Sequence, residues 1–296
     1  MKERTIYALG FFDGVHLGHQ ALLLACRHLA ERTDCAAGAV TFTSHPETLV
    51  QGKAPQLINS IEDRMRLLCG YGMKKLVPLP FDTALRSMPW QDFLQMLQKD
   101  HGAVGFVCGD DFRFGYRGEG TAQTLSDYCR ENNLPWAVVP AQNCDGIRIS
   151  STYIRQLLQA GQVREANRFL GHPHTLSGTV IQGRQLGRTI GIPTANLALP
   201  EGVICPKFGV YACKAVVCGK EYLAVTNIGT RPTVGGHHVT VEPWLLDFEG
   251  DLYGETLALA FYDFLRPEQK FDSLEQLQAA IRKNAAQARE CLEVTL

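Results

Sequence analysis

The chain has 296 residues, and its 29 lysine and arginine residues nearly balance its 30 aspartate and glutamate residues. That length predicts about two domains, and the balanced charge gives no sign of a nucleic-acid or membrane partner. We find neither a secretory leader after Met1 nor an apolar run of membrane-spanning length, so we expect a cytoplasmic protein. The ten cysteines include no Cys-x-x-Cys pair, which favours free thiols packed as small apolar residues.

The chain begins with an apolar, partly β-branched run at Thr5–Leu9, which predicts a buried strand, and a leucine- and alanine-rich helix is expected at residues 21–30. His16 and His19 lie at the junction between them, where unpaired N–H groups and the helix dipole favour a phosphate. Imidazoles three positions apart point to the same side and can donate hydrogen bonds to a leaving polyphosphate. We therefore interpret this turn as part of a nucleotide site.

The same His-x-x-His spacing is also found in metal sites and on ordinary helix faces. A zinc site would need further cysteine, histidine or carboxylate ligands, and the local sequence offers only Asp13. Zinc is therefore the weaker interpretation of the pair.

Strand-like runs and helical stretches alternate through the rest of the first half of the chain. They cover residues 36–42, 61–69, 75–79, 89–97 and 104–108. This alternation predicts a doubly wound parallel sheet. Ligands of such sheets bind beyond the carboxyl ends of the strands, and the first of these ends carries His16 and His19.

Two further segments fall where such a ligand site would need them. Residues 109–115 form a turn with carboxylates, an arginine and two aromatics, although a solvated loop with buried phenylalanines would explain the same residues. Residues 150–152 place three hydroxyls at a helix start, with Arg148 and Arg155 on either side. A simple N-cap explains the hydroxyls but not the arginines, whereas a polyphosphate site explains both.

The second half of the chain changes to short β-rich runs separated by turns, after a short helix at residues 161–171. These runs cover residues 178–181, 210–217, 221–227, 238–246 and 256–262. They predict a small antiparallel barrel and a boundary near His172, which gives domains 1–172 and 173–296. Residues 273–293 open with Ser-x-x-Gln and keep Leu274, Leu277 and Ile281 on one face, so we expect a closing amphipathic helix.

Residues 183–196 combine glycines, basic side chains and a rigid Pro193 followed by Thr194 and Asn196, but they contain no P-loop. Such a segment can wrap phosphates, and the oxygens of Thr194 and Asn196 can reach a magnesium ion that keeps most of its waters. An ordinary glycine-rich surface loop is the alternative interpretation.

The first-half segments resemble the bacterial bifunctional riboflavin kinase/FAD synthetase family, whose adenylyltransferase module has a Gly-x-Phe-Asp-Gly-x-His-x-Gly-His motif. Gly10, Phe12, Asp13, Gly14, His16, Gly18 and His19 fill this motif. The family's Gly-x-Asp-Phe-x-Phe-Gly and Ile-Ser-Ser-Thr-x-Ile-Arg motifs fall on residues 109–115 and 149–155. Phe11 departs from the asparagine of many members, and residues 41–46 stand where a Phe-x-x-x-Pro segment is usual.

This resemblance implies roles for individual residues of the first half. Besides the first motif, it implies that Gly109, Asp111, Ser150, Ser151 and Thr152 bind the nucleotide. It implies that His16, His19 and Arg155 take part in adenylyl transfer.

The second half carries the flavokinase signature Gly-Arg-x-x-Gly-x-Pro-Thr-Ala-Asn at residues 187–196. The resemblance implies that Thr194 and Asn196 handle Mg·ATP and that Glu242 is the base facing the riboflavin 5′-hydroxyl, although a strand glutamate is by default a surface residue. It also implies nucleotide binding by Gly183, Arg188, Gly191 and Pro193. Pro243, Trp244 and residues 235–238 depart from the family pattern.

The function implied by the resemblance is ATP-dependent phosphorylation of riboflavin to FMN, followed by adenylylation of FMN to FAD with release of pyrophosphate. One alternative is a nucleotidylyltransferase for another phosphorylated acceptor, and another is a flavin-binding sensor without turnover. An aminoacyl-tRNA synthetase also uses a similar histidine pair, but the chain has no Lys-Met-Ser-Lys-Ser segment. Riboflavin, FMN and ATP with Mg²⁺ are the expected small-molecule partners.

Overall fold

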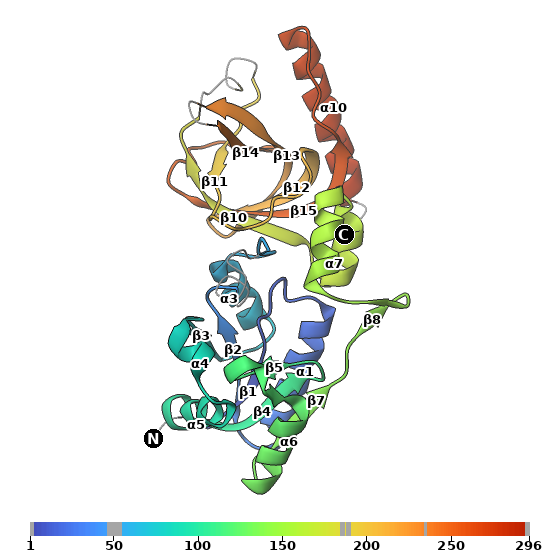
Figure 1. Cartoon of the computed structure of the whole chain (residues 1–296). Coiled ribbons are helices and arrows are strands. Elements are labelled where there is room, and N and C mark those ends of the chain that lie inside the picture. Colours follow the sequence, from blue (N-terminus) through green and yellow to red (C-terminus); the bar gives the residue numbers. More distant parts are fainter. Residues whose placement is uncertain (1–2, 46–54, 184–186, 188–190, 234–235, 294–296) are drawn as a thin grey trace. The chain divides into compact units, whose positions relative to one another are not determined.

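A computed structural model of the chain describes residues 3–45, 55–183, 187, 191–233 and 236–293 (Figure 1). The chain divides into two compact units. The first comprises residues 1–57 and 61–151, and the second comprises residues 58–60 and 152–296.

The first unit is built on a parallel sheet with the strand order β3-β2-β1-β4-β7. Its strands are β1 (Thr5–Leu9), β2 (Ala36–Phe42), β3 (Lys75–Leu79), β4 (Ala103–Gly109) and β7 (Trp136–Val139). The chain runs from β1 to β2 and β3 on one side, then crosses to β4 and β7 on the other. The carboxyl ends of β1 and β4 therefore flank the point where the strand order reverses, which is where ligands of such sheets bind. The predicted doubly wound sheet is confirmed.

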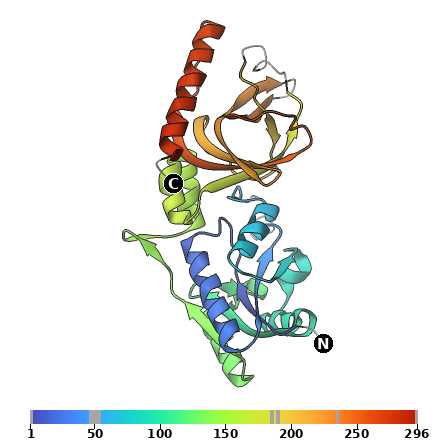
Figure 2. The same ribbon diagram turned by 180° about the vertical axis from the view of Figure 1, so that it is seen from behind.

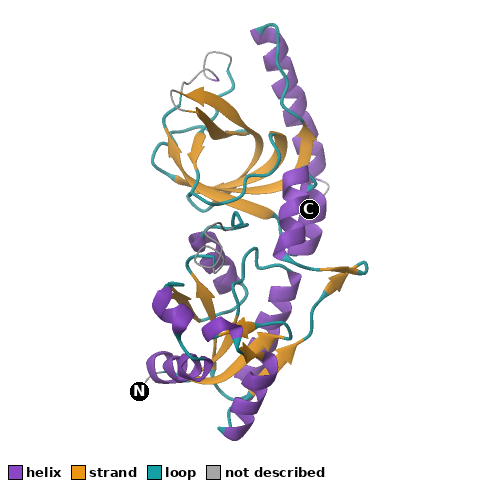
Figure 3. Ribbon diagram, viewed as in Figure 1, coloured by secondary structure: helices purple, strands orange, loops and turns teal. Residues whose placement is uncertain are grey.

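Helices cover both faces of this sheet (Figure 3). Leu23 and Leu68 of α1 and α3 pack with Ile6 on one face, whereas Phe93 and Leu125 of α5 and α6 pack with Tyr7 on the other. β1 is therefore buried on both sides, which explains its continuous apolar run. These helices are α1 (Leu17–Arg32), α3 (Ile61–Gly70), α5 (Trp90–His101) and α6 (Ala122–Glu131).

Several short elements of the first unit escaped the sequence prediction. They are α4 (Thr83–Ser87), β5 (Arg113–Phe114), the 3-10 turn η1 (Tyr116–Gly118), β6 (Gly120–Thr121), β8 (Asn143–Cys144) and β9 (Ile147–Arg148). The β8–β9 hairpin, the light-green excursion at the left of Figure 2, turns at Asp145 and Gly146, which have positive φ angles of 51° and 77°. Such Asp-Gly pairs are typical of tight hairpins. The hairpin delivers Arg148 to the segment that precedes α7 (Ser151–Ala160).

The second unit contains a closed barrel with the strand order β10-β11-β14-β13-β12-β15, preceded by α7 and α8 (Val163–Leu170). Its strands are β10 (His174–Ile181), β11 (Asn196–Ala198), β12 (Gly209–Val217), β13 (Lys220–Thr233), β14 (Gly236–Leu245) and β15 (Thr256–Arg266). All the pairings that close the barrel are antiparallel, so the predicted barrel is confirmed.

The C-terminal helix α10 (Leu274–Glu293) packs on the barrel through Ala285, Ala288 and Leu292, which contact Val210 and Val225 among others. Its start has the expected capping form, because Oγ of Ser273 accepts from the N–H of Gln276 at 3.3 Å. The expected contact face was wrong at its first residue, since Leu274 is 61% exposed. The small alanines of the later turns, not the leucine of the first, bring this helix against the strands.

Candidate functional site

The turn that joins β1 to α1, residues 10–16, is called the first-motif turn below. Phe12 and Val15 have φ angles of 57° and 40°, a left-handed region that side chains other than glycine rarely adopt. Backbone strain of this kind persists only where surrounding contacts hold it in place.

Side chains from four parts of the first unit supply those contacts. The carbonyl oxygen of Phe11 accepts from Oγ1 of Thr41 at 2.7 Å, and that of Val15 accepts from Nε2 of Gln20 at 2.9 Å. The carbonyl oxygen of Asp13 accepts from Oγ of Ser151 at 2.9 Å. Alternate carbonyls of the turn are thus each tied to a side chain, and one of these ties joins the first motif to the start of α7. A fourth segment, α3, reaches the same turn through Arg64.

The two histidines of the first motif stack on each other, with ring centroids 3.7 Å apart and an interplanar angle of 11°. The N–H of His19 donates to Nδ1 of His16 at 3.3 Å, so His16 is the N-cap of α1. A neutral imidazole that accepts at Nδ1 carries its proton on Nε2, so Nε2 is the donor of such a ring. Gly18 makes room for this ring, because a Cβ at that position would lie 3.2 Å from Cε1 of His16.

Burial lowers the pKa of His19 well below its usual value, and neighbouring His16 and Arg64 lower it further. His19 is therefore neutral near neutral pH. A neutral imidazole remains a hydrogen-bond donor through one of its two nitrogens.

The three sequence motifs of the first unit meet in one cleft with a volume of about 510 Å³. The cleft is lined by His16, Gly18, His19, Leu22, Gly109, Asp110, Asp111, Val139, Pro140, Ala141, Gln142, Arg148, Ile149, Ser150 and Ser151. It lies beyond the carboxyl ends of β1, β4 and β7, where the strand order reverses. Seven of the predicted site residues thus share a cleft although 135 positions separate the first, His16, from the last, Ser151.

The remaining predicted residues of this half take other places. Gly10, Phe12, Asp13 and Gly14 belong to the first-motif turn but are not among the residues that line the cleft. Phe12 and Asp13 are buried, so they support the turn from behind. Thr152 and Arg155 lie on α7 in the part of the chain grouped with the second unit, and their place at the cleft stays a prediction.

Both acidic side chains of the cleft are held by partners. Oδ2 of Asp111 lies 2.5 Å from Nη2 of Arg148, and Oδ2 of Asp110 accepts from the N–H of Ala141 at 3.2 Å. These contacts tie the second motif to the segment after β7 and to the β8–β9 hairpin. An exposed ion pair adds little stability, so its main effect here is to fix the position of the Arg148 guanidinium at the cleft.

Sequence reasoning missed Arg64 of α3, which is fully buried behind the first-motif turn. Nη1 of Arg64 donates to the carbonyl oxygens of Phe11 at 3.1 Å and Phe42 at 2.9 Å. The available signal was its spacing, since Arg64 lies four residues before buried Leu68 on the apolar face of the helix.

In the second unit, the candidate base and a candidate metal ligand are neighbours across two strands. β11 and β14 pair at Leu197 and Val241, a register that places Asn196 opposite Glu242. β13 pairs Asn227 with Glu242. Directly opposed residues project from the same face of a sheet. Asn196, Glu242 and Asn227 therefore form a polar row across β11, β14 and β13, and Asn227 is a member that the sequence did not single out for a role.

The glycine-rich segment approaches the same residues closely. A Cβ at Gly183 would lie 2.1 Å from Nδ2 of Asn196, and one at Gly187 would lie 3.2 Å from Oγ1 of Thr194. The absence of a side chain at both positions therefore lets backbone pass against the two predicted metal ligands. Gly191 has a positive φ of 67°, and Arg188 falls outside the described residues.

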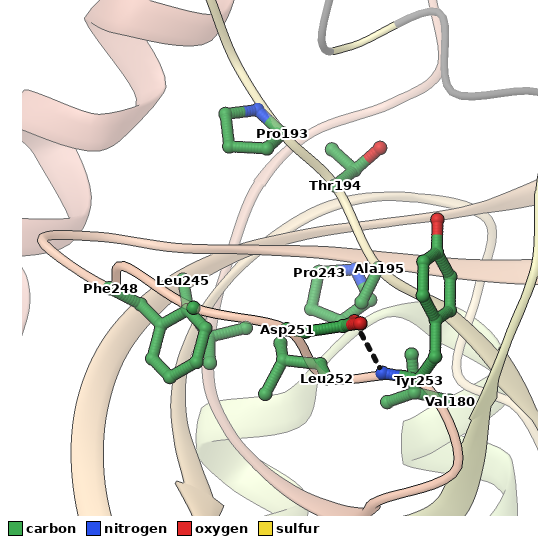
Figure 4. Close-up of a pocket in the computed structure, with 11 residues that line it drawn as sticks. Val180, Pro193, Thr194, Ala195, Pro243, Leu245, Phe248, Asp251, Leu252 and Tyr253 are labelled. Atoms are coloured by element: carbon green, nitrogen blue, oxygen red, sulfur yellow. Dashed lines mark hydrogen bonds between the residues drawn. The ribbon is translucent and has the colours of Figure 1, made fainter.

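Pro193 and Thr194 line a small pocket of about 70 Å³ (Figure 4). Its other lining residues are Val180, Ala195, Pro243, Leu245, Phe248, Gly250, Asp251, Leu252 and Tyr253. In Figure 4 the rings of Phe248 and Tyr253 stand on opposite sides of the view, and the N–H of Tyr253 donates to Oδ1 of Asp251 at 3.0 Å. A pocket of this size matches one part of a ligand rather than a whole nucleotide, whose sites span roughly 300 Å³ or more.

Within the residues that the structure covers, no helix is both long enough and apolar enough to cross a membrane.

The chain matches two family models, described as FAD synthetase over residues 1–153 and as riboflavin kinase over residues 170–292. It is 35% identical to the bifunctional riboflavin kinase/FMN adenylyltransferase of Listeria monocytogenes over 96% of this chain and 91% of the relative. It is 36% identical to the protein of the same name from Escherichia coli K12, over 99% of this chain and 95% of the relative.

A solved structure from Streptococcus pneumoniae, described as a macrolide-efflux protein, has the same fold. It is 32% identical, superposes with a TM-score of 0.88, and the match covers 98% of this chain and 95% of that chain. The two matched models follow the order in which the sheet and the barrel occur along the sequence. On this evidence the chain belongs to the family of bifunctional riboflavin kinase/FMN adenylyltransferases.

Proposed function

We propose that each of the two activities resides in one unit of the chain, with FMN adenylylation at the cleft of the parallel sheet and riboflavin phosphorylation at the barrel. The observation that carries this proposal is the meeting of three sequence-distant motifs in one cleft where the strand order reverses. The two matched family segments support the same division. The boundary near residue 172 is part of this proposal.

For adenylylation, the phosphate of FMN attacks the α-phosphorus of ATP, a new P–O bond forms, and the bond to pyrophosphate breaks. A phosphate monoester is already an anion near neutral pH, since its second pKa is about 6, so the site needs no base. We assign His16 and His19 to hydrogen bonds with the departing polyphosphate. Alignment and charge stabilisation of this kind supply most of the catalysis in phosphoryl-type transfers.

The rest of the cleft positions the nucleotide. Gly109 and Asp111 belong to its wall, and Ser150 and Ser151 supply hydroxyls and N–H groups at the start of α7. Thr152 continues that helix start, and Arg155 provides positive charge for the phosphates in this proposal. Donors at a helix N-terminus suit a phosphate group.

For phosphorylation of riboflavin, we assign Glu242 as the base that accepts the proton of the ribityl 5′-hydroxyl. That oxygen bonds to the γ-phosphorus of ATP, and the bond from this phosphorus to the leaving ADP breaks. Gly183, Arg188, Gly191 and Pro193 belong to the segment that holds the ATP phosphates. The polar row Asn196, Glu242 and Asn227 supports this assignment, because it places the base beside a predicted metal ligand.

The residues present fit a magnesium ion bound together with ATP. In the described parts of the chain, no group of three or more His, Cys, Asp or Glu residues could hold a metal alone. Mg²⁺ prefers oxygen ligands and keeps several waters when it is shared with phosphates, and Thr194 and Asn196 offer a hydroxyl and an amide oxygen beside the glycine-rich segment. When bound, the ion would neutralise phosphate charge.

A cytoplasmic location is likewise proposed, and cell fractionation would test it.

The test follows riboflavin, FMN and FAD by chromatography during incubation with ATP and Mg²⁺. The His19→Ala variant is expected to form FMN but no FAD. The Glu242→Gln variant is expected to leave riboflavin unchanged and still convert added FMN to FAD. Equal loss of both activities in either variant would contradict separate sites.

A further inference from the structure

Arg64 is the largest of the fully buried side chains in the described part of the chain, yet it belongs to none of the motifs. Its Nη1 donates to the carbonyl oxygen of Phe42 at 2.9 Å, to that of Phe11 at 3.1 Å, and to Oγ1 of Thr41 at 3.3 Å. These acceptors lie at the carboxyl ends of β1 and β2. One side chain of α3 therefore joins two strand ends at the place where the first-motif turn leaves the sheet.

The guanidinium also faces the motif itself. Nη2 of Arg64 lies 3.9 Å from Oδ1 of Asp13, which is only 1% exposed. Cζ of Arg64 lies 4.4 Å from the centre of the Phe11 ring. The guanidinium of Arg64 thus lies close to the carboxylate of Asp13 and to the ring of Phe11, the residues on either side of the strained Phe12.

This burial has a stability cost that folding alone does not explain. A buried charge is costly unless all its donors are satisfied, and Nε and Nη2 of Arg64 make no hydrogen bond within the described residues. An apolar side chain of similar volume would usually serve the core as well or better. The cost is consistent with a role in the neighbouring site.

We propose that Arg64 is a positioning residue for adenylyl transfer, which fixes the first-motif turn so that the histidine pair meets the polyphosphate in the reactive geometry. This inference rests on the proposed role of His16 and His19.

Several charged or titratable groups surround His19. His16 stacks on it, Arg64 acts on it from α3, and Asp13 lies in the turn. Asp110, Asp111 and Arg148 line the same cleft. Of these groups, His16 and Arg64 lower the pKa of His19 in addition to burial. Removing the charge of Arg64 should therefore raise the pKa of His19, whereas a lysine should largely preserve it.

The experiment compares Arg64→Lys and Arg64→Met in the full-length chain, with Arg66→Met as the matched control. Arg66 lies two residues further along α3, its side chain is 55% exposed, and its Nη2 lies 2.5 Å from Oδ1 of Asp63. Each preparation is assayed for FAD formation from FMN and for FMN formation from riboflavin. FMN formation from riboflavin shows whether the substitution has disturbed the rest of the chain.

We expect both Arg64 variants to lower kcat for adenylyl transfer by about 100-fold, the loss that a displacement of about 1 Å can cause, with little change in the KM for ATP. The acid limb of the pH profile should move to higher pH in Arg64→Met but not in Arg64→Lys. Phosphorylation of riboflavin by Arg64→Lys should equal that of the Arg66→Met control.

Three results would overturn the proposal. They are adenylyl transfer equal to that of the control, a parallel loss of both activities in Arg64→Lys, and identical pH profiles for the two Arg64 variants. Failure of the proposed function is distinguishable, because it would show in the His19→Ala variant or in the wild-type chain without any change at Arg64.

Discussion

Gly18 and His16 show how closely the first-motif turn is fitted. Because a Cβ at Gly18 would lie 3.2 Å from the His16 ring, Gly18→Ala should tilt that ring away from its donor position. We expect a loss of FAD formation of about 10-fold to 100-fold, since small displacements of positioned groups are costly, with FMN formation unchanged. Steady-state assays of both activities measure this.

Gly70→Ala is the matched control, because nothing lies within 4 Å of a Cβ at the last residue of α3. It should leave both activities intact. Equal effects of the two substitutions would show that the fit around His16 is unimportant.

His174 makes the second unit sensitive to acid. Its ring is fully buried, neither ring nitrogen makes a hydrogen bond within the described part of the chain, and burial lowers its pKa from 6.5 to about 3. The unfolded chain therefore binds more protons than the folded chain between these two values, so stability falls as the pH falls below 6.5. The loss between about pH 7 and about pH 5 should be roughly 2 kcal/mol.

Urea unfolding at these pH values measures the effect. The His174→Phe variant should lose the contribution of His174 and keep that of buried His19, whereas His28→Gln, a change at an exposed residue of α1, should retain both. A wild-type stability that does not change with pH would contradict a neutral buried His174.

At the scale of residues, the sequence located the groups that line the cleft better than the groups that hold it. His16, His19, Asp111 and Ser151 belong to local patterns with a chemical reason, a turn before a helix or a helix start. Arg64 acts through contacts with residues 11, 13, 41 and 42, and such a set exists only after folding. The same holds for Asn227, whose partner Glu242 is set by strand register.

Helix α10 shows what individual elements contribute to the barrel. Ala288 is fully buried in the cluster that joins this helix to β12 and β13, whereas Ala286 faces solvent. Ala288→Asp would bury an unpaired carboxylate, so it should lower the unfolding free energy by more than about 2 kcal/mol and reduce riboflavin phosphorylation at elevated temperature.

The control is Ala286→Asp, which should change stability by less than about 0.5 kcal/mol. Thermal melting followed by circular dichroism measures both variants. Similar melting of the two would show that the contact between α10 and the barrel adds no stability.

Elements with long periodic or β-branched runs were predicted well, and short ones were not. β1, β2 and β3 have the predicted bounds, because their apolar runs are buried on both faces of the sheet or end at clear turn residues. β11, with three residues, and the two-residue strands of the β8–β9 hairpin carry too few residues to show a period. For α10 the pattern predicted the helix but not which of its turns contact the barrel.

At the scale of the whole molecule, each candidate site draws its lining residues from one compact unit. A mixture of the His19→Ala and Glu242→Gln variants should therefore convert riboflavin to FAD, because FMN made by the first can diffuse to the second. The product should form after a lag that shortens as protein concentration rises.

Chromatography of the mixture over time tests this, with each variant alone as the control. A mixture that accumulates FMN without FAD would show that FMN reaches the adenylylation site only within its own chain.

The sequence predicted two architectures in the correct order because alternating helices and strands differ in period from short antiparallel strands. The boundary near His172 stays a prediction; α7 and α8 lie around the gap between the two matched segments.

The hydrogen bonds that hold the first-motif turn can form only as later parts of the chain are synthesised. Residues 10–16 are made before their side-chain donors, which come from residues 20, 41, 64 and 151. The last of these contacts, from Ser151 to Asp13, cannot form until Ser151 has been made. A growing chain that ends before α7 therefore carries both histidines without the completed turn, and the turn is complete only when the first unit has been made up to Ser151.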